Sequence, residues 1–260
     1  QRQVATAMSE IVAEGVADPD VPQTLLDVFT PIVDESKIHF NGDGIQMRAV
    51  DPAKVAMSWA DLSETAFEAW DAPGAVTIGA NLEAFEDRLG VADDSVVSVA
   101  VDMESYYLTV GTDTSDMEMA LIDPDSIRKE PDLPDLDLPN TVVLSRERLA
   151  HALDVVDMVS KHIDIVADPD AGEVRFVGEG DTDGNTVSYG RDELEEGTQL
   201  GELTESKFSM EYMTALVSGI PKNTDVTMTV GEEFPIKLEW TAMDGRLNVT
   251  QVQAPRISTK

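Results

Sequence analysis

Side chains that commonly hold metals or move protons are sparse in this sequence. Its three histidines, His39, His151 and His162, occur at no spacing typical of a zinc site, and no cysteine is present to act as ligand, nucleophile or disulfide partner. There is no Walker loop and no G-x-G-x-x-G, G-x-S-x-G or H-E-x-x-H motif. We therefore predict no catalytic residue, no metal site and no cofactor.

One acidic stretch, residues 181–185 (DTDGN), resembles the opening of a calcium-binding loop. Such a loop needs glycine at its sixth position for a sharp turn and a bidentate glutamate at its twelfth. Those positions hold Thr186 and Asp192 instead. We therefore interpret the stretch as a polar hairpin turn.

Close pairs of carboxylates, such as Asp123 with Asp125 and Asp93 with Asp94, could hold Mg²⁺ or perform acid–base chemistry. The chain has 51 Asp and Glu residues, so close pairs arise by chance, and no neighbouring base accompanies them. A hydrolase with carboxylate-bound metal is thus kept only as an alternative, to be tested by turnover of model phosphoesters.

Charge is the strongest compositional feature: 18 Lys and Arg oppose 51 Asp and Glu, giving a net charge of −33. The acids are spread along the whole chain, which favours a surface adapted to a high-salt cytoplasm. Net charge far from zero keeps a protein soluble, and the Debye length falls to about 3 Å at 1 M salt, so self-repulsion is screened. The alternative is an acidic decoy that mimics DNA and binds basic proteins.

Length and hydropathy indicate a folded protein with one large or two ordinary domains. The chain has 260 residues, 42% of them hydrophobic, enough to bury a core. No apolar run approaches the roughly 18 residues that would span a bilayer, and no signal-peptide pattern occurs. We expect a soluble, cytoplasmic protein with no membrane partner.

The elements that would position any site fall into two similar series, each with two short helices and about seven or eight strands. Alternating strands joined by tight turns favour antiparallel sheets, and amphipathic helices would cover one face, which predicts an α+β fold. In the first series we expect strands at 11–17, 37–40, 45–50, 55–62, 65–70, 95–101, 106–111 and 116–122, with helices beginning at Pro22 and after Asn81. In the second we expect strands at 141–144, 162–166, 174–177, 186–189, 225–230, 235–240 and 246–252, with helices capped by Ser145 and Ser209.

Residues 119–139 separate the two series and contain four prolines and no glycine. Proline fixes φ and favours extended geometry in the preceding residue, so this segment is predicted to be a semi-rigid extended strap. We accordingly predict an N-terminal extension (1–10), a first domain (11–118), the strap (119–139) and a second domain (140–258).

Three segments resemble a known family in this order and at the expected separations: IQMRAVDPAKVAM (45–57), LIDPDSIRKEPDLPDLDLP (121–139) and QAPRI (253–257). They look like the archaeal sliding clamps of the proliferating cell nuclear antigen type. The resemblance implies a DNA-clamp fold of two similar domains, assembled as a three-fold ring whose helices line a central hole. Ring closure in the family pairs edge strands, which would correspond to roughly 109–119 and 183–189 here.

Clamps of this family encircle duplex DNA and tether DNA polymerase, clamp loader, flap endonuclease and ligase. Partners insert a short motif, with one aliphatic and two aromatic residues, into a pocket under the strap. An exposed apolar patch rimmed by charge suits that role. Matched to this sequence, the resemblance assigns the pocket to Val50, Lys54, Val55, Met57, Ile127, Leu133, Pro134, Pro235, Val252, Ala254, Pro255 and Ile257.

The helix faces that line the hole depart from the family pattern, which places Lys and Arg there to meet DNA phosphates. The aligned positions hold Gln23, Thr24, Thr30, Asp87, Asp154, Glu211 and Ser218. The basic residues that remain near the helices, and are our DNA-facing candidates, are Arg88, Arg146, Arg148, Lys161 and Lys222.

High salt accounts for such a lining. Affinity from phosphate contacts comes from counterion release and falls steeply as salt rises. A closed ring needs no affinity, because threaded DNA cannot leave sideways. The sequence therefore predicts a processivity factor that holds DNA by enclosure, with cations bridging acids to phosphates.

Overall fold

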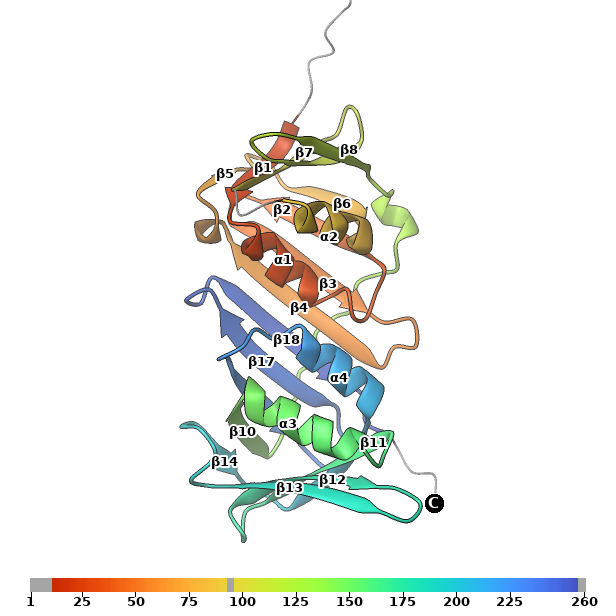
Figure 1. Ribbon diagram of the computed structural model, residues 1–260, viewed down its shortest axis with the longest axis vertical. Helices are drawn as coiled ribbons and strands as arrows, with labels where there is room; N and C mark the ends of the chain where they lie inside the picture. The colour runs from red at the N-terminus through yellow and green to blue at the C-terminus, as the bar shows by residue number, and fades with distance from the viewer. Residues whose placement is uncertain (1–10, 93–95, 257–260) are drawn as a thin grey trace, which may run out of the picture. The chain divides into compact units, whose positions relative to one another are not determined.

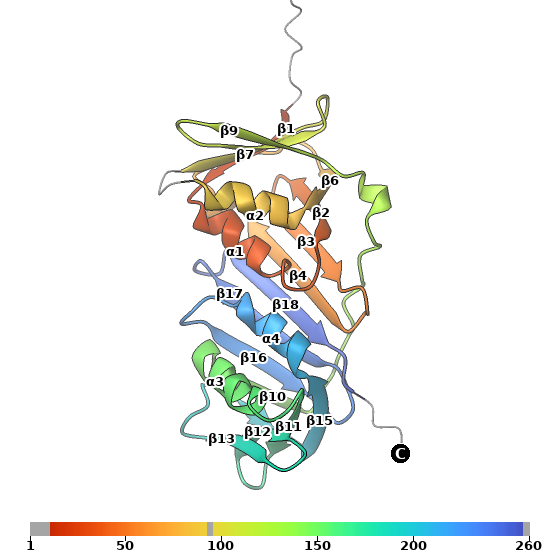
Figure 2. The same ribbon diagram turned by 45° about the vertical axis from the view of Figure 1, so that its right-hand side comes forward.

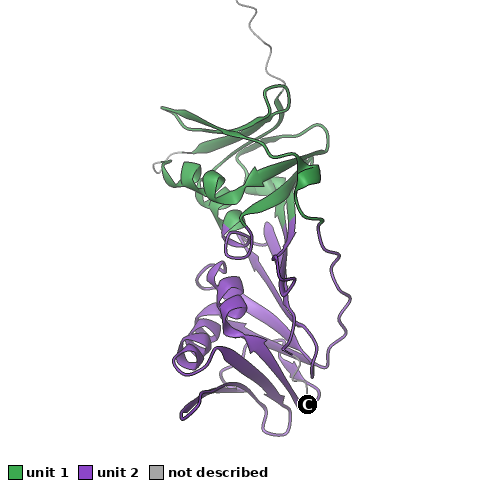
Figure 3. Ribbon diagram, turned by 90° about the vertical axis from the view of Figure 1, so that its right-hand side faces the viewer, with its two compact units in different colours: residues 1–26, 34–47, 61–129 green, residues 27–33, 48–60, 130–260 purple. Residues whose placement is uncertain are grey.

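The computed structural model describes residues 11–92 and 96–256 of the 260-residue chain. The predicted extension at residues 1–10, the pair Asp93 and Asp94, and the pocket candidate Ile257 lie outside the described residues. Two compact units are coloured in Figure 3: unit 1 is residues 1–26, 34–47 and 61–129, and unit 2 is residues 27–33, 48–60 and 130–260. The chain thus crosses between units several times before residue 130.

The first series of elements runs from Ile11 to the strap. Its members are β1 (Ile11–Ala17), α1 (Asp20–Asp27), β2 (Glu35–Asn41), β3 (Gly44–Val50), β4 (Ala56–Ser63), the 3₁₀ turn η1 (Glu64–Ala66), β5 (Ala69–Asp71), β6 (Val76–Asn81), α2 (Leu82–Gly90), β7 (Val97–Asp102), β8 (Tyr107–Gly111) and β9 (Asp116–Ala120).

The second series repeats the first, after the 3₁₀ turn η2 (Pro124–Ser126) within the strap. Its members are β10 (Asn140–Ser145), α3 (Arg146–Asp157), β11 (His162–Asp168), β12 (Glu173–Glu179), β13 (Gly184–Gly190), β14 (Gln199–Leu200), β15 (Thr204–Ser209), α4 (Met210–Ser218), β16 (Asp225–Val230), β17 (Ile236–Ala242) and β18 (Leu247–Gln253). Both series read strand, helix, five strands, helix, three strands among the described residues.

The pairing of strands is duplicated as well. Order β5-β1-β7-β8-β9 in the first series corresponds to β14-β10-β16-β17-β18 in the second, and β4-β3-β2-β6 corresponds to β13-β12-β11-β15. The registers determined for these pairs are antiparallel, as the alternating patterns predicted. The α+β class and the duplicated architecture are therefore confirmed.

Each unit packs two helices side by side on its strands, as Figures 1 and 2 show for α1 with α2 and for α3 with α4. The stripe on α2 formed by Leu82, Phe85 and Leu89 is buried. On α3 the buried residues recur at the spacing of one helical face, at Leu149, Leu153 and Val156. The hydrophobic effect of burying these stripes holds the helices on the sheets.

The helix caps follow the sequence prediction in two of three cases. The Asn81 side chain accepts a hydrogen bond from the Ala84 N–H at 2.8 Å, and Ser145 Oγ accepts one from Arg148 N–H at 3.4 Å. Ser209 precedes α4 as predicted, but its side chain makes no capping hydrogen bond. Helix α1 begins at Asp20, two residues before the predicted Pro22.

Three strands were not predicted, and each lacks the usual signal. Strand β6 contains Gly79, which allows the close approach of another backbone segment. The buried positions of β15 include Thr204 and Ser206, so its alternation is not a hydrophobic one. Strand β14 has only two residues. The prediction of seven or eight strands per series was thus too low, since the described residues show nine in each.

The predicted strand at 65–70 was wrong in its first half. Residues Glu64–Ala66 form a 3₁₀ turn, whose N-cap Ser63 accepts from the Thr65 N–H, and β5 begins only at Ala69. A hydroxyl that bonds the local backbone competes with strand pairing at such a position.

In the part of the chain that the structure describes, the longest α-helix, α3, has 12 residues. Crossing a bilayer takes about 20 residues of apolar helix. None of the described helices reaches that length.

Candidate partner-binding site

The loop Asp51–Ala56, counted here with the first residue of β4, is organised by one carboxylate. Asp51 retains 2% of its surface, and its carboxylate accepts hydrogen bonds from three backbone N–H groups of the loop: Ala53 at 2.7 Å, Val55 at 2.6 Å and Ala56 at 2.7 Å. Backbone N–H groups that point at an ionised acceptor make strong bonds. Lys54 adopts a positive φ of 61°, which the tight loop requires. The A-V-D-P-A-K segment is therefore fixed in one conformation.

The end of β18 lies against this loop. The Ala254 N–H donates to the Val55 carbonyl at 2.8 Å, and two residues later the Arg256 N–H donates to the Lys207 carbonyl of β15 at 2.7 Å. Both bonds lie within unit 2. The first bond brings two of the three family-like segments together.

A side chain from α4 completes the surroundings of Asp51. The Tyr212 hydroxyl donates to Asp51 Oδ2 at 3.0 Å. Burial of the phenol raises the pKa of Tyr212, and the hydrogen bond to the Asp51 carboxylate raises it further. The neutral, donating form of Tyr212 is thereby favoured.

The strap is anchored at its beginning in unit 1 and at its end in unit 2. Ile122 exchanges two backbone hydrogen bonds with Gly79, at 2.8 and 3.1 Å, and a Cβ at Gly79 would lie 2.6 Å from Ile127 Cδ1. At the other end, a Cβ at Gly231 would lie 3.0 Å from a methyl of Leu138. Two glycines thus let the strap ends pack directly against backbone.

The pocket candidates differ in how much surface they offer. Val50 and Val252 are buried, Val252 with 2% exposure, so they support the site from within the sheet. Leu133 is exposed at 49%, and Lys54 is exposed as well. The remaining described candidates are half-buried: Val55, Met57, Ile127, Pro134, Pro235, Ala254 and Pro255. Of the described candidates, all but Ile127 belong to unit 2, while Ile127 packs on Gly79 in unit 1.

Sequence reasoning missed Phe234, which precedes the candidate Pro235 and is 54% exposed. Glu233 before it has a positive φ of 56°, and its N–H donates to Ser206 Oγ at 2.8 Å, so the turn that presents Phe234 is ordered. An aromatic residue in the E-E-F-P segment, directly before the candidate Pro235, is the signal that could have identified it.

Among the DNA-facing candidates, Arg88 is hydrogen-bonded to backbone carbonyls of its own unit. Its guanidinium donates to the Ala84 carbonyl at 2.5 Å and twice to the Glu118 carbonyl, at 2.9 and 3.3 Å, which ties α2 to β9 within unit 1.

Arg146 and Lys222 lie near each other at the start of α3 and the loop after α4. The Glu147 carboxylate accepts from the Asn223 N–H at 2.9 Å, and this bond, with the nearby Arg146 and Lys222 charges, lowers the pKa of Glu147. The Arg146 Nε is buried and has no hydrogen-bond partner among the described residues.

The other two candidates, both in unit 2, pair with acids. Arg148 Nη1 lies 2.7 Å from Glu195 Oε1, and Lys161 Nζ lies 3.5 Å from Asp157 Oδ1 with 85% of its side chain exposed. Exposed ion pairs of this kind contribute little to stability. The basic residues near the helices are thus mostly engaged with local acceptors.

The three histidines belong to three different elements, β2, α3 and β11. His39 contacts Thr77 Oγ1 at 2.8 Å in unit 1, while His151 is exposed on α3 in unit 2. Burial and the nearby Arg256 and Lys207 lower the pKa of His162 at the start of β11. Across residues 11–92 and 96–256 no three His, Cys, Asp or Glu side chains are grouped so as to hold a metal ion.

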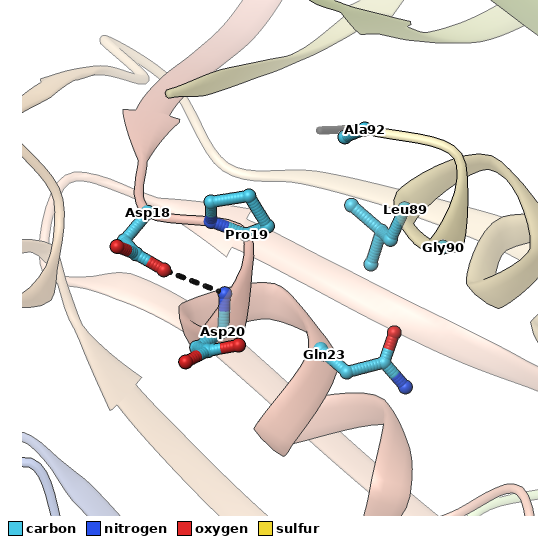
Figure 4. Close-up of a pocket in the computed structure, with 7 residues that line it drawn as sticks. All are labelled: Asp18, Pro19, Asp20, Gln23, Leu89, Gly90 and Ala92. Carbon is cyan, nitrogen blue, oxygen red and sulfur yellow. Dashed lines mark hydrogen bonds between the residues drawn. The ribbon is translucent and has the colours of Figure 1, made fainter. Parts of the chain in front are cut away.

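A small polar cleft of about 290 Å³ lies in unit 1 beside the start of α1 and the end of α2 (Figure 4). Its lining includes Asp18, Asp20, Gln23 and Leu89. Asp18 Oδ1 accepts from the Asp20 N–H at 3.0 Å, so this carboxylate serves as a local turn cap.

The outermost strands suit the edges that the resemblance assigned to ring closure. In unit 1, β9 is the last strand of the five-stranded sheet β5-β1-β7-β8-β9. In unit 2, β13 is an end strand of the four-stranded sheet β13-β12-β11-β15. Within residues 11–92 and 96–256, no strand pairs with the outer side of either one, so each presents a row of backbone groups there.

Comparisons with known proteins agree with this architecture. Residues 17–126 match the family model described as the N-terminal domain of proliferating cell nuclear antigen. The chain is 41% identical over 247 residues to a DNA polymerase sliding clamp of Natronomonas pharaonis, covering 95% of this chain and 99% of the relative. It is 40% identical over 248 residues to the sliding clamp of Haloarcula marismortui, with the same coverage of both chains.

Solved structures give the same result for the fold. The A. fulgidus PCNA bound to the C-terminal region of FEN-1 is 28% identical, with a TM-score of 0.88, covering 95% of this chain and all of that chain. The PCNA from Thermococcus kodakaraensis, 23% identical, superimposes with a TM-score of 0.83 over 94% of this chain and all of its own. The fold is thus that of the PCNA-type clamps.

Identity of about 40% over nearly the full length of both chains goes beyond a shared fold. This chain belongs to the family of DNA polymerase sliding clamps.

Proposed function

We propose that this chain is a non-catalytic processivity factor that forms a homotrimeric ring around duplex DNA in a high-salt cytoplasm. Within the ring, each chain would tether DNA polymerase, clamp loader, flap endonuclease and ligase by their short peptide motifs. The observation that carries the proposal is the duplicated architecture in a member of the clamp family, with the two outer segments of the predicted pocket joined at Val55 and Ala254. The domain boundaries 11–118 and 140–258, joined by the strap 119–139, are part of the proposal.

Ring closure is supported by the edge strands. Pairing β9 of one protomer with β13 of the next would leave neither edge open. Acids near both edges, Asp116 and Glu118 on β9 and Asp183 before β13, would repel across the junction in dilute buffer. We therefore expect a trimer in multimolar KCl that weakens as salt is removed.

The DNA is proposed to be held by enclosure. The candidates Arg88, Arg148 and Lys161 are engaged with carbonyl or carboxylate oxygens, and phosphate affinity is small in concentrated salt. Arg146 and Lys222, which flank Glu147, are the pair that remains for phosphate contacts when salt is low.

The partner pocket is supported by the FEN-1 peptide complex of the A. fulgidus relative. In this chain the proposed contact surface within unit 2 is Lys54, Val55, Met57, Leu133, Pro134, Pro235, Ala254 and Pro255, supported by Val50 and Val252. Ile127 and Ile257 stay predictions from the resemblance. We add Phe234, whose exposed ring stands next to Pro235.

Binding of a partner peptide tests the pocket. A peptide with one aliphatic and two aromatic anchors, titrated in multimolar KCl, should bind the trimer with one site per protomer. Absence of binding by a protein that is trimeric would refute the tethering part of the proposal. Hydrolysis of model phosphoesters with Mg²⁺ would instead favour the hydrolase alternative, and salt-sensitive capture of basic proteins by a monomer would favour the decoy.

A further inference from the structure

Three parts of unit 2 meet at the loop Asp51–Ala56: the loop itself, the end of β18 and helix α4. The hydrogen bonds among them form a closed circuit. Tyr212 of α4 bonds Asp51, Asp51 bonds the N–H of Val55, and the Val55 carbonyl bonds Ala254. Hydrogen bonds from the last residues of β18 to α4 and the residue before it complete this circuit.

Two buried glutamines of β18 donate these hydrogen bonds. Gln251 Nε2 donates to the Leu216 carbonyl at 3.3 Å, and Gln253 Nε2 donates to the Ser209 carbonyl at 3.0 Å. Both glutamines retain 0% of their surface. Buried polar groups are costly unless bonded, so the two donor contacts favour one arrangement of β18 against α4 and the residue before it, while Gln253 Oε1 has no hydrogen-bond partner among the described residues.

The loop is joined to α4 and β18 through the Asp51 carboxylate and the Val55 carbonyl. Its backbone N–H groups turn inward to Asp51, whose carboxylate would otherwise be bonded only within the loop. The Tyr212 hydroxyl is the donor that joins this carboxylate to α4. Without that hydroxyl, the bonds from Asp51 to the backbone N–H groups would still fix the conformation of the loop, but the loop would be held less firmly against α4.

We propose that Tyr212 is a positioning residue of the partner pocket: through Asp51 it fixes Lys54 and Val55 opposite Ala254 before a partner binds. The inference rests on the proposed docking of partner peptides at this surface. Pre-organised surfaces bind more tightly because less ordering is needed on association. Tyr212 itself need not touch the peptide.

The variant Tyr212→Phe tests this, because it deletes one oxygen and keeps the ring. We expect the amides of Ala53, Val55 and Ala56 to exchange hydrogen about threefold to tenfold faster, as the loss of one net hydrogen bond allows. The affinity for the partner peptide should fall by a similar factor, expressed in faster dissociation.

Thr198→Val is the matched control. The Thr198 hydroxyl accepts from the Val143 N–H at 3.0 Å and donates to the Glu195 carbonyl at 3.0 Å. It lies beside β10 and β14, which are three and four strands away from β18 in the order of their sheet. Its loss should lower stability without changing exchange in the loop or the dissociation rate of the peptide.

Two results would overturn the inference: unchanged loop exchange in Tyr212→Phe, or equal effects of Tyr212→Phe and Thr198→Val on peptide dissociation. The exchange measurement needs no peptide. If the unaltered trimer binds no partner peptide, the proposed tethering fails while the exchange data still decide whether Tyr212 positions the loop.

Discussion

Charged side chains have different roles on the helix surfaces and in the loop that contains Asp51. On the helices, basic residues are few and bond local oxygens, as Arg88 does with Glu118 and Arg148 with Glu195. In the loop, a single buried carboxylate accepts four hydrogen bonds and fixes the backbone around it. The contrast is what we expect if, as proposed, the ring encloses DNA without specific attachment and partners bind a surface that is ordered beforehand.

The largest expected effect is on partner binding. Leu133→Asp places a charge on the exposed apolar part of the strap, so partner peptide affinity should fall by about thirtyfold or more, as for an anchor residue worth at least about 2 kcal/mol. Titration in multimolar KCl measures it. Val91→Asp, an equally drastic change at an exposed aliphatic residue outside the pocket, should leave affinity unchanged. Equal binding by both variants would remove Leu133 from the site.

A second change addresses the strap's anchor in unit 1. Gly79→Ala puts a Cβ 2.6 Å from both the Ile122 carbonyl oxygen and Ile127 Cδ1, so the free energy of unfolding should drop by about 1–3 kcal/mol. Gly74→Ala is the control, since a Cβ there meets nothing within 4 Å. Denaturant titration of both variants gives the comparison. Similar unfolding midpoints would mean that the start of the strap shifts to accommodate the added methyl group without loss of stability.

A third prediction concerns pH. Because the pKa of Tyr212 is raised in the folded protein, its contribution to stability is complete below the pKa of the unfolded chain and is lost as pH rises through the folded value. The unaltered protein should therefore lose its stability advantage over Tyr212→Phe on the alkaline side. The raised pKa of Tyr189 affects both proteins alike. A constant difference across alkaline pH would show that the hydroxyl is not bonded in solution.

The smallest effect should come from the helix face. Replacing Arg146 and Lys222 together by glutamine should change retention on closed circular DNA by less than about twofold in multimolar salt, because phosphate contacts contribute little there. Arg191→Gln, exposed in the loop after β13, controls for net charge. A tenfold loss specific to the double variant would show that phosphate attraction, rather than enclosure, retains the DNA.

Much of this organisation could be predicted from the sequence. Hydrophobic periodicity located the helix stripes, and the A-V-D-P, strap and Q-A-P-R-I segments identified the family. Strands such as β15 were missed because buried Thr204 and Ser206 stand where aliphatic residues are expected. Their hydroxyls are satisfied by partners distant in the chain, such as the Gly231 carbonyl bonded by Ser206.

The candidate site was assigned from the sequence by resemblance, but its internal hydrogen bonds could not be predicted. Asp51 lies in the recognised motif, yet its role depends on Tyr212, 161 residues away, and periodicity carries no signal for such a pair. Likewise, the resemblance assigned Val252 to an exposed apolar patch, whereas it is buried near the end of β18. Position in a motif indicates proximity to the site, and only the packing decides exposure.

Enclosure is tested most directly by cutting the DNA. The protein is mixed with nicked circular duplex at low salt, transferred to multimolar KCl and separated by size before and after the circle is linearised. We predict that it co-migrates with the circle, dissociates once the DNA has ends, and does not bind short linear duplex. Co-migration that survives linearisation, or a monomeric mass in the same salt, would contradict the account.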